Sequence, residues 1–203
     1  MSTPSGPESE GGKPKDPHTF SQDFQIANLS ARVPEKVARG VFSTGVLVLQ
    51  GATEFVLDFV LRMNQPHQVV ARVVLPLNLV PQLIEAMKIN LEKYRQQFGA
   101  PPPAMPMPPP PPTPPTIEEI YQNLKMSDEV TVGTYANSVM IVHTAAEFCF
   151  EFITNFYPKA VISSRVFLSA PQVPVMLRTL TQSWQNFQAK LQQQQKPPSP
   201  PPA

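Results

Sequence analysis

The sequence has 203 residues, of which 15% are charged, a net charge of +1 and a single cysteine, Cys149. This composition excludes an internal disulfide framework, and it gives the chain no overall basic field that would attract nucleic acid or anionic membranes. No apolar run reaches the roughly 20 residues of a membrane-spanning helix, and residues 1–16 lack the apolar core of a signal peptide. We therefore expect a soluble, cytoplasmic protein.

The first folded unit is expected at residues 20–99, and residues 20–39 are interpreted as a lead-in that docks on this unit. Residues 41–50 are rich in β-branched and apolar side chains, which predicts a strand. Strict alternation of apolar and other residues predicts a second strand over residues 55–62. A third strand follows at residues 69–75, so that the three strands form an antiparallel meander.

The register of the hairpin between the second and third strands can be predicted from its side chains. A turn centred on Gln65 places Phe55 opposite Leu75 and Asp58 opposite Arg72, so that apolar residues face each other and an acid faces a base. A helix then begins at Pro81, because a proline in the first helical turn loses no hydrogen bond.

Proline-rich segments separate the folded parts. Residues 100–116 include Pro108–Pro112 and are expected to form a linker, since polyproline lacks donors and prefers an extended helix. Residues 1–19 and the tail at residues 192–203 are expected to be disordered. A short helix opened by a capping box, in which Thr116 pairs with Glu119, is predicted to follow the linker.

The second unit, residues 117–191, repeats the first at a constant separation of 93 positions. Glu147 follows Glu54 at this separation, and Arg165 follows Arg72. The same hairpin rule places Glu151 opposite Arg165. We therefore predict an α+β protein with two tandem β-β-β-α units, each an antiparallel meander packed by one helix.

One face of each predicted sheet carries phenylalanines and is expected to lie under the helix. The other face is too apolar for full solvation, so a second copy of the unit is the expected cover. Its residues are Val56, Val60, Val70, Val74, Cys149, Ile153 and Phe167. This predicts a pseudo-dimer within the chain or a homo-oligomer of chains, joined through these faces.

Several motifs resemble a known family. They are the segment Gly133–Val139 with its Tyr-Ala-Asn sequence, Glu147-Phe148 with Phe152, and Ser164–Ser169. With these motifs the second copy resembles the prokaryotic domain of unknown function 3467 family, and the first copy resembles it through Glu54-Phe55, Arg72-Val73 and the helix end at Phe98-Gly99. Both copies lack the Ser-Pro and Ala-Lys that usually follow the third strand in that family. The resemblance implies the domain and no particular activity.

Few residues suggest catalysis or metal binding. Cys149 and His143 could form a nucleophile and base, but a packed cysteine is the preferred interpretation. His18, His67 and His143 lack metal-ligand spacing, so no metal and no cofactor are predicted. The residues singled out are structural or interface candidates: Asp58, Arg72, Glu151, Arg165, Glu54 and Glu147. The two cross-strand pairs are expected to be ion pairs buried where two sheets meet. The last two glutamates are expected to accept hydrogen bonds from nearby backbone N–H groups.

The favoured function is a non-enzymatic protein–protein interaction or assembly protein that associates with itself, and its proline-rich segments could also bind a protein partner. One alternative is a single-stranded nucleic-acid-binding protein of the sheet-plus-helix repeat type, similar to the purine-rich-element and whirly proteins, although no strand face concentrates Arg and Lys beside aromatic residues. A second alternative is a SecB-like holdase chaperone. Salt-sensitive binding of single-stranded DNA would favour the former, and binding of an apolar dye would favour the latter.

Overall fold

A computed structural model describes residues 31–104, 113, 115–156 and 159–194, and each half of the chain supplies strands and one long helix. The first half contains α1 (Glu35–Ala38), β1 (Val41–Ser43), β2 (Gly45–Gln50), β3 (Glu54–Leu61), β4 (His67–Pro76) and α2 (Leu79–Phe98). The second half contains α3 (Ile117–Gln122), β5 (Leu124–Met126), α4 (Asp128–Val132), β6 (Thr134–Tyr135), β7 (Ser138–His143), β8 (Glu147–Phe156), β9 (Lys159–Ser169), the 3-10 turn Ala170–Gln172 and α5 (Val173–Gln194).

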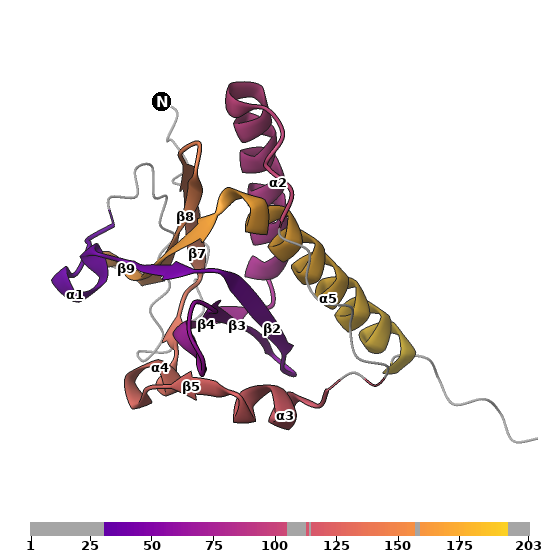
Figure 1. Cartoon of the computed structure of the whole chain (residues 1–203). Coiled ribbons are helices and arrows are strands. Elements are labelled where there is room, and N and C mark those ends of the chain that lie inside the picture. Colours follow the sequence, from indigo (N-terminus) through magenta and orange to yellow (C-terminus); the bar gives the residue numbers. More distant parts are fainter. Residues whose placement is uncertain (1–30, 105–112, 114, 157–158, 195–203) are drawn as a thin grey trace, which may run out of the picture.

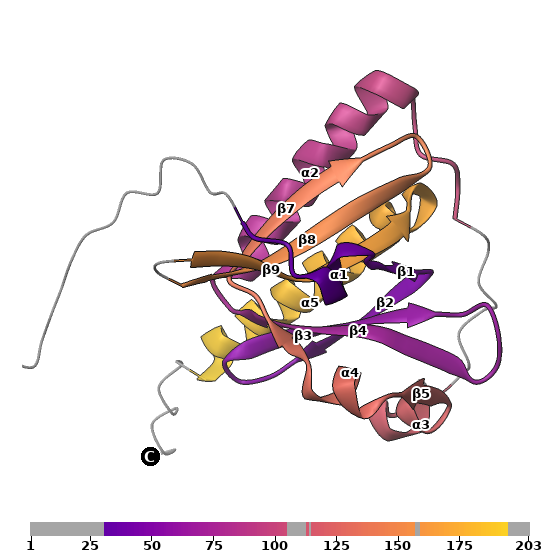
Figure 2. The ribbon, with the colours of Figure 1, turned by 90° about the vertical axis from the view of Figure 1, so that its left-hand side faces the viewer.

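The strands form two sheets (Figure 1). Sheet A has the order β1-β9-β8-β7, and sheet B has the order β2-β3-β4-β5, with β6 also paired to β4. Figure 2 shows the long helices α2 and α5 behind the sheets and α1 in front of them, while α3 and α4 lie at the lower edge of the molecule. The predicted α+β fold, with two units of strands and one long helix each, is confirmed.

The strand predicted at residues 41–50 is in fact divided between the two sheets. Residues Val41–Ser43 pair in parallel with β9 of the second unit, whereas Gly45–Gln50 pair with β3 of their own unit. The second unit does the same, because Thr134 and Tyr135 pair with β4 before β7 joins β8. The exchange follows a pseudo-two-fold symmetry: Val41 pairs with Val166, and their counterparts 93 positions away, Thr134 and Val73, also pair.

The predicted hairpin registers are confirmed in both units. Asp58 pairs with Arg72, and Glu151 pairs with Arg165. Each second strand also has an irregularity that was not predicted, after Phe59 in β3 and after Phe152 in β8. These positions correspond at the same 93-residue separation, so the bulge is a property of the unit.

The two units share one core, formed by their phenylalanine faces and both long helices. Phe59 of one unit and Phe152 of the other meet at a ring-centroid distance of 5.7 Å. The helices are exchanged, because Phe187 of α5 lies 5.8 Å from Phe55 and Tyr94 of α2 lies 5.3 Å from Phe148. The prediction that the units meet through their valine faces is therefore wrong. The larger phenylalanine faces bury more apolar surface when both units and both helices enclose them.

The lead-in segments are exchanged as well, and they cover part of the outer, valine-bearing faces. Arg32 forms a parallel bridge with Val161 of β9, and Ala31 and Val37 pack on Ile153 and its neighbours. In the second unit, β5 pairs with β4. The described part of the first lead-in thus docks on the second unit, which corrects the prediction that it docks on the first. Parallel pairing with a partner's third strand leaves no signal in local periodicity.

The expected tails and linker lie mostly outside the described residues. This holds for residues 1–19, for 105–112 and 114 within the linker, and for 195–203. Residues 192–194, which were expected to belong to the tail, form the last turn of α5. The capping box of Thr116 and Glu119 is present at the start of α3. Among the described residues, no helix is both long and apolar enough to cross a membrane.

Candidate functional site

Small polar residues stand where each first strand crosses from one sheet to the other. In the first unit, the Thr44 backbone N–H and side-chain hydroxyl both donate to the carbonyl oxygen of Val60, and the Thr44 hydroxyl accepts from Arg62 N–H. In the second unit, Asn137 bonds both backbone groups of Asn155 at 2.8 and 3.0 Å. The Tyr-Ala-Asn motif therefore holds the crossing strand to the bulged strand beside it, which satisfies backbone groups that the bulge leaves unpaired.

The Asp58–Arg72 pair lies on the outer face of sheet B. The guanidinium Nε and Nη2 donate to the two carboxylate oxygens at 2.8 and 2.7 Å, and the Asp58 side chain is fully buried. Tyr121 of α3 also donates its hydroxyl proton to Asp58. The hydrogen bond to Asp58 raises the pKa of Arg72, and burial is the main reason that the pKa of Tyr121 rises to about 12. The acid therefore has three donors from two units.

The Glu151–Arg165 pair is the counterpart on sheet A. Both Nε and Nη2 donate to one oxygen of Glu151, at 2.8 and 2.5 Å. Nη1 of Arg165 donates to the Ala38 carbonyl at 2.6 Å, as Nη1 of Arg72 does to the Thr131 carbonyl at 3.3 Å. Both arginines thus join a carboxylate of their own unit to the lead-in helix of the other. The predicted pairs form, and they tie the units together beneath the exchanged lead-ins.

Glycine is required where each lead-in passes over its arginine. Gly40 and Gly133 have φ values of 65° and 75°. A Cβ at Gly133 would lie 3.0 Å from Cγ of Arg72, and one at Gly40 would lie 2.6 Å from the Phe167 ring. Both the positive φ and the close approach exclude larger residues without strain.

Glu54 and Glu147 begin their strands as expected, but their carboxylates bond side chains. Thr53 donates its hydroxyl proton to Glu54, and Thr144 donates to Glu147 at 2.8 Å. The prediction of backbone N–H donors is corrected, because the adjacent turn supplies a threonine hydroxyl within easier reach. Glu147 lines a cavity of about 280 Å³ together with Glu151 and Arg165, and the two arginines line a second cavity between β4 and β9. Glu54 lines neither of them.

Cys149 and His143 both line a cavity of about 280 Å³, but no hydrogen bond joins their side chains. His143 pairs with Phe148, and its ring lies on the inner face beside Tyr94 and Phe98. Cys149 follows Phe148 in β8, so its side chain points to the opposite, outer face. Burial is the main reason that the pKa of Cys149 rises to about 11, which keeps the thiol protonated at neutral pH. Within the described part of the chain, no group of three or more His, Cys, Asp or Glu residues could hold a metal.

Each outer face carries a row of apolar residues that crosses the whole sheet. On sheet A the paired positions are Val142, Cys149, Phe167 and Phe42, and on sheet B they are Leu49, Val56, Val74 and Tyr135. The outermost strands differ in their cover. Met140 and Val142 of β7 are 46% and 51% exposed, whereas their counterparts Leu47 and Leu49 of β2 are only partly exposed.

The helix α3 explains this difference. A cavity of about 240 Å³ beside β2 is lined by four consecutive strand residues together with Ile117, Ile120 and Tyr121 of α3. Consecutive residues of a strand share a cavity only along its edge, so α3 lies beside the β2 edge. Among the described strands β7 pairs with β8 alone, and α2 contacts it through Tyr94 and Phe98 beside His143. The counterpart of α3 in the first unit, residues 24–29, lies outside the described residues. Alternation along the sequence identifies a strand without identifying its neighbours, so the position of β7 at the end of its sheet could not be predicted.

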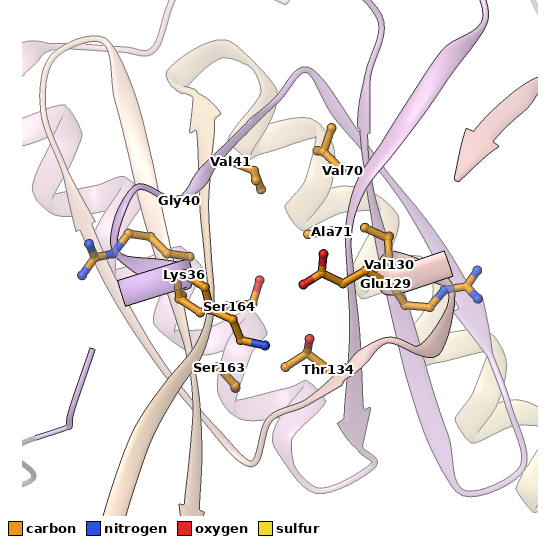
Figure 3. A pocket seen from close by; sticks show the side chains of 13 residues that line it. Lys36, Gly40, Val41, Val70, Ala71, Glu129, Val130, Thr134, Ser163 and Ser164 are labelled. Atoms are coloured by element: carbon orange, nitrogen blue, oxygen red, sulfur yellow. The ribbon is translucent and has the colours of Figure 1, made fainter. Parts of the chain in front are cut away.

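A second cavity, of about 260 Å³, lies between β4 and β9 near the pseudo-two-fold axis. Figure 3 shows Lys36 and Glu129 entering it from opposite sides, with Val41, Val70 and Ala71 toward the top and Ser163 and Thr134 toward the bottom. Of these residues only Val70 was singled out from the sequence, as part of the apolar outer face. The available signal was that several of them differ from the residue 93 positions away.

Comparisons with known proteins identify a family and nothing further. The sequence model of a family described as "Protein of unknown function (DUF3467)" matches residues 7–101 and, separately, residues 108–193. No curated protein and no solved structure matches the chain. The two matched segments agree with the two structural units and cover most of the sequence.

Proposed function

Because the chain belongs to the DUF3467 family, whose function is unknown, we propose from its own geometry that it is a non-enzymatic assembly protein that binds a second copy of itself through the edge of β7. The observation that carries this proposal is that β7 is the last strand of sheet A and that Met140 and Val142 on its outer face are about half exposed. Such an edge presents unpaired N–H and C=O groups to which another strand can bond.

The composition of β7 suits pairing with a second copy. Residues Ser138–His143 include no Asp, Glu, Lys or Arg, so two copies bring no like charges together. Antiparallel pairing centred on Ile141 would place Met140 opposite Val142 of the second copy. Both residues belong to the outer face, and a two-fold axis normal to the sheet keeps them there. The apolar rows of the two copies would then form one continuous surface.

The edge of β2 supports the same interpretation. It is the counterpart of β7, and within this chain it is accompanied by Ile117 and Ile120 of α3. The edge strand of a unit can therefore be accompanied by a segment that carries apolar residues, as β2 is by α3. For β7, a second copy would provide both the strand hydrogen bonds and the apolar contacts.

The test is the mass of the full chain in solution, measured by light scattering over a range of concentrations. We expect twice the 22.5 kDa chain mass for the wild type and the single mass for Val142→Lys, because a charge at the centre of the new contact would be desolvated. Val132→Lys is the matched control, since Val132 is an 84% exposed valine on α4, and it should remain dimeric. A monomeric wild type, or a dimer that survives Val142→Lys, would overturn the proposal.

The two alternative classes give different signals in the same preparations. A nucleic-acid-binding protein would shift labelled single-stranded DNA in a salt-sensitive manner, and a holdase would bind an apolar dye in its assembled form. Either result with a monomeric wild type would replace self-association as the proposed function.

A further inference from the structure

The cavity between β4 and β9 has walls that come in symmetry-related pairs. Arg72 and Arg165 correspond and are identical, and Val37 and Val130 form a second identical pair. Gly40 also lines the cavity, whereas its counterpart Gly133 does not. These residues hold the exchanged lead-ins against the sheets, so the framework of the cavity is the same on both sides of the axis.

The remaining lining residues differ between the two sides. The differing pairs are Lys36 and Glu129, Val41 and Thr134, Val70 and Ser163, and Ala71 and Ser164. All three uncharged differences place an apolar residue from the first unit opposite a hydroxyl from the second. The cavity therefore has an aliphatic side and a hydroxyl side, with a cation and an anion between them (Figure 3).

The two charged residues face the cavity without pairing with each other. The ion pairs among the described residues involve neither Lys36 nor Glu129. Their side chains extend from α1 and α4 on opposite walls. A ligand with one negative and one positive group could satisfy both.

Ser164 adds a hydroxyl. It is only 9% exposed, its side chain points into the cavity in Figure 3, and it makes no hydrogen bond to a described residue. Ser163, in contrast, donates to the carbonyl of Phe152 at 3.1 Å and serves the fold. The Ser164 hydroxyl is therefore available to a ligand, as is that of Thr134 on the same side of the cavity.

We propose that this cavity binds a small aliphatic amino acid in its zwitterionic form. Lys36 binds the carboxylate, Glu129 binds the ammonium group, and the Ser164 hydroxyl bonds the carboxylate. The aliphatic side chain lies against Val41, Val70 and Ala71. The size agrees, because 260 Å³ is slightly below the roughly 300 to 1,000 Å³ of pockets for drug-sized ligands.

The site depends on the duplication but not on the proposed self-association. Two identical chains related by a two-fold axis would present two lysines or two glutamates at this place. Tandem copies in one chain can present one of each. Because β7 lies away from these lining residues, a monomeric chain would retain the cavity.

The experiment is calorimetric titration of the full chain with L-valine, isovalerate and isobutylamine. Isovalerate lacks the ammonium group, and isobutylamine lacks the carboxylate. We expect both analogues to bind at least about tenfold more weakly than L-valine, a loss of about 1.4 kcal/mol. Lys36→Met should weaken L-valine and isovalerate but not isobutylamine. Glu129→Gln should weaken L-valine and isobutylamine but not isovalerate.

Matched controls are Lys88→Met and Glu85→Gln, which remove an exposed pair on α2 away from the cavity, and these should leave all three affinities unchanged. Ser164→Ala should weaken L-valine while keeping the preference for the zwitterion. The proposal is overturned if L-valine gives no binding heat, if both analogues bind as well as L-valine, or if neither cavity variant changes the affinities.

Discussion

Helix α3 adds to the cover on the outer face of sheet B, whereas the described lead-in places α1 and residues 31–32 on the outer face of sheet A. Tyr121 of α3 bonds Asp58, and Ile117 and Ile120 lie beside β2. On sheet A, Met140 and Val142 remain about half exposed. The two units share the contacts that join them, while corresponding outer-face residues such as Leu47 and Met140 differ in exposure among the described residues.

The ion pairs show the same contrast. Asp58 accepts from Arg72 and Tyr121, whereas Glu151 accepts from Arg165 alone among the residues that the structure describes. Both arginines keep their bond to a carbonyl of the other unit. The bond that links the units is conserved between the copies, and the additional donor belongs to the covered face.

The largest effect is expected from charge reversal at Arg165, because its partner Glu151 has fewer described hydrogen-bond donors than Asp58 has. Arg165→Glu places two acids together under α1 and removes the bond to Ala38, so the free energy of unfolding should fall by about 3 to 5 kcal/mol. Adding Glu151→Arg should recover part of this loss, but not the bond to Ala38. Urea denaturation measures both. An unchanged midpoint for Arg165→Glu would show that this pair does not join the units.

Alanine substitutions at Gly40 and Gly133 should lower the stability by different amounts. Gly40→Ala and Gly133→Ala both force a side chain into a positive φ, which costs about 1 to 2 kcal/mol. Gly40→Ala should cost more, because its Cβ lies 2.6 Å from Phe167 whereas that of Gly133 lies 3.0 Å from a flexible arginine stem. Thermal unfolding of the two variants compares them. Equal losses would mean that the Phe167 ring moves aside freely.

A single hydroxyl distinguishes the exchanged helices. Tyr94 of α2 donates to the Ala145 carbonyl at 2.7 Å, and its counterpart on α5 is Phe187. Tyr94→Phe should therefore lower the free energy of unfolding by about 1 kcal/mol. Urea denaturation of the variant, with Tyr135→Phe on the exposed face as the control, tests this. A loss of the same size in the control would remove the special role of Tyr94.

The smallest effect should appear at high pH. The pKa of Tyr121 is raised from 10.0 to about 12 in the folded chain, so the folded state binds this proton more tightly than the unfolded state. Its contribution is complete below pH 10 and is lost as the pH rises from 10 to 12. The difference in stability between wild type and Tyr121→Phe should shrink over this range. A difference that stays constant would show that Tyr121 is not held by α3 over Asp58.

Local sequence patterns predicted the two units, but they did not predict the contacts between the units. The registers of Asp58 with Arg72 and of Glu151 with Arg165 could be predicted because hairpin partners are near in sequence and their faces must match. The division of the strand at residues 41–50 could not be predicted, because both of its parts have the same alternation. The cavity residues Lys36, Glu129 and Ser164 come together only through the exchange of the lead-ins.

The sequence by itself determined that one β-β-β-α unit occurs twice, since a constant separation of 93 residues and the face-matched hairpins need no distant contact to be recognised. Only the tertiary structure decided which faces meet, which strands cross between the sheets and which strand lies at the end of each sheet. The physical reason is that burial stabilises any apolar face. Which of the two faces of a sheet is buried depends on the total apolar surface that both units and both helices enclose.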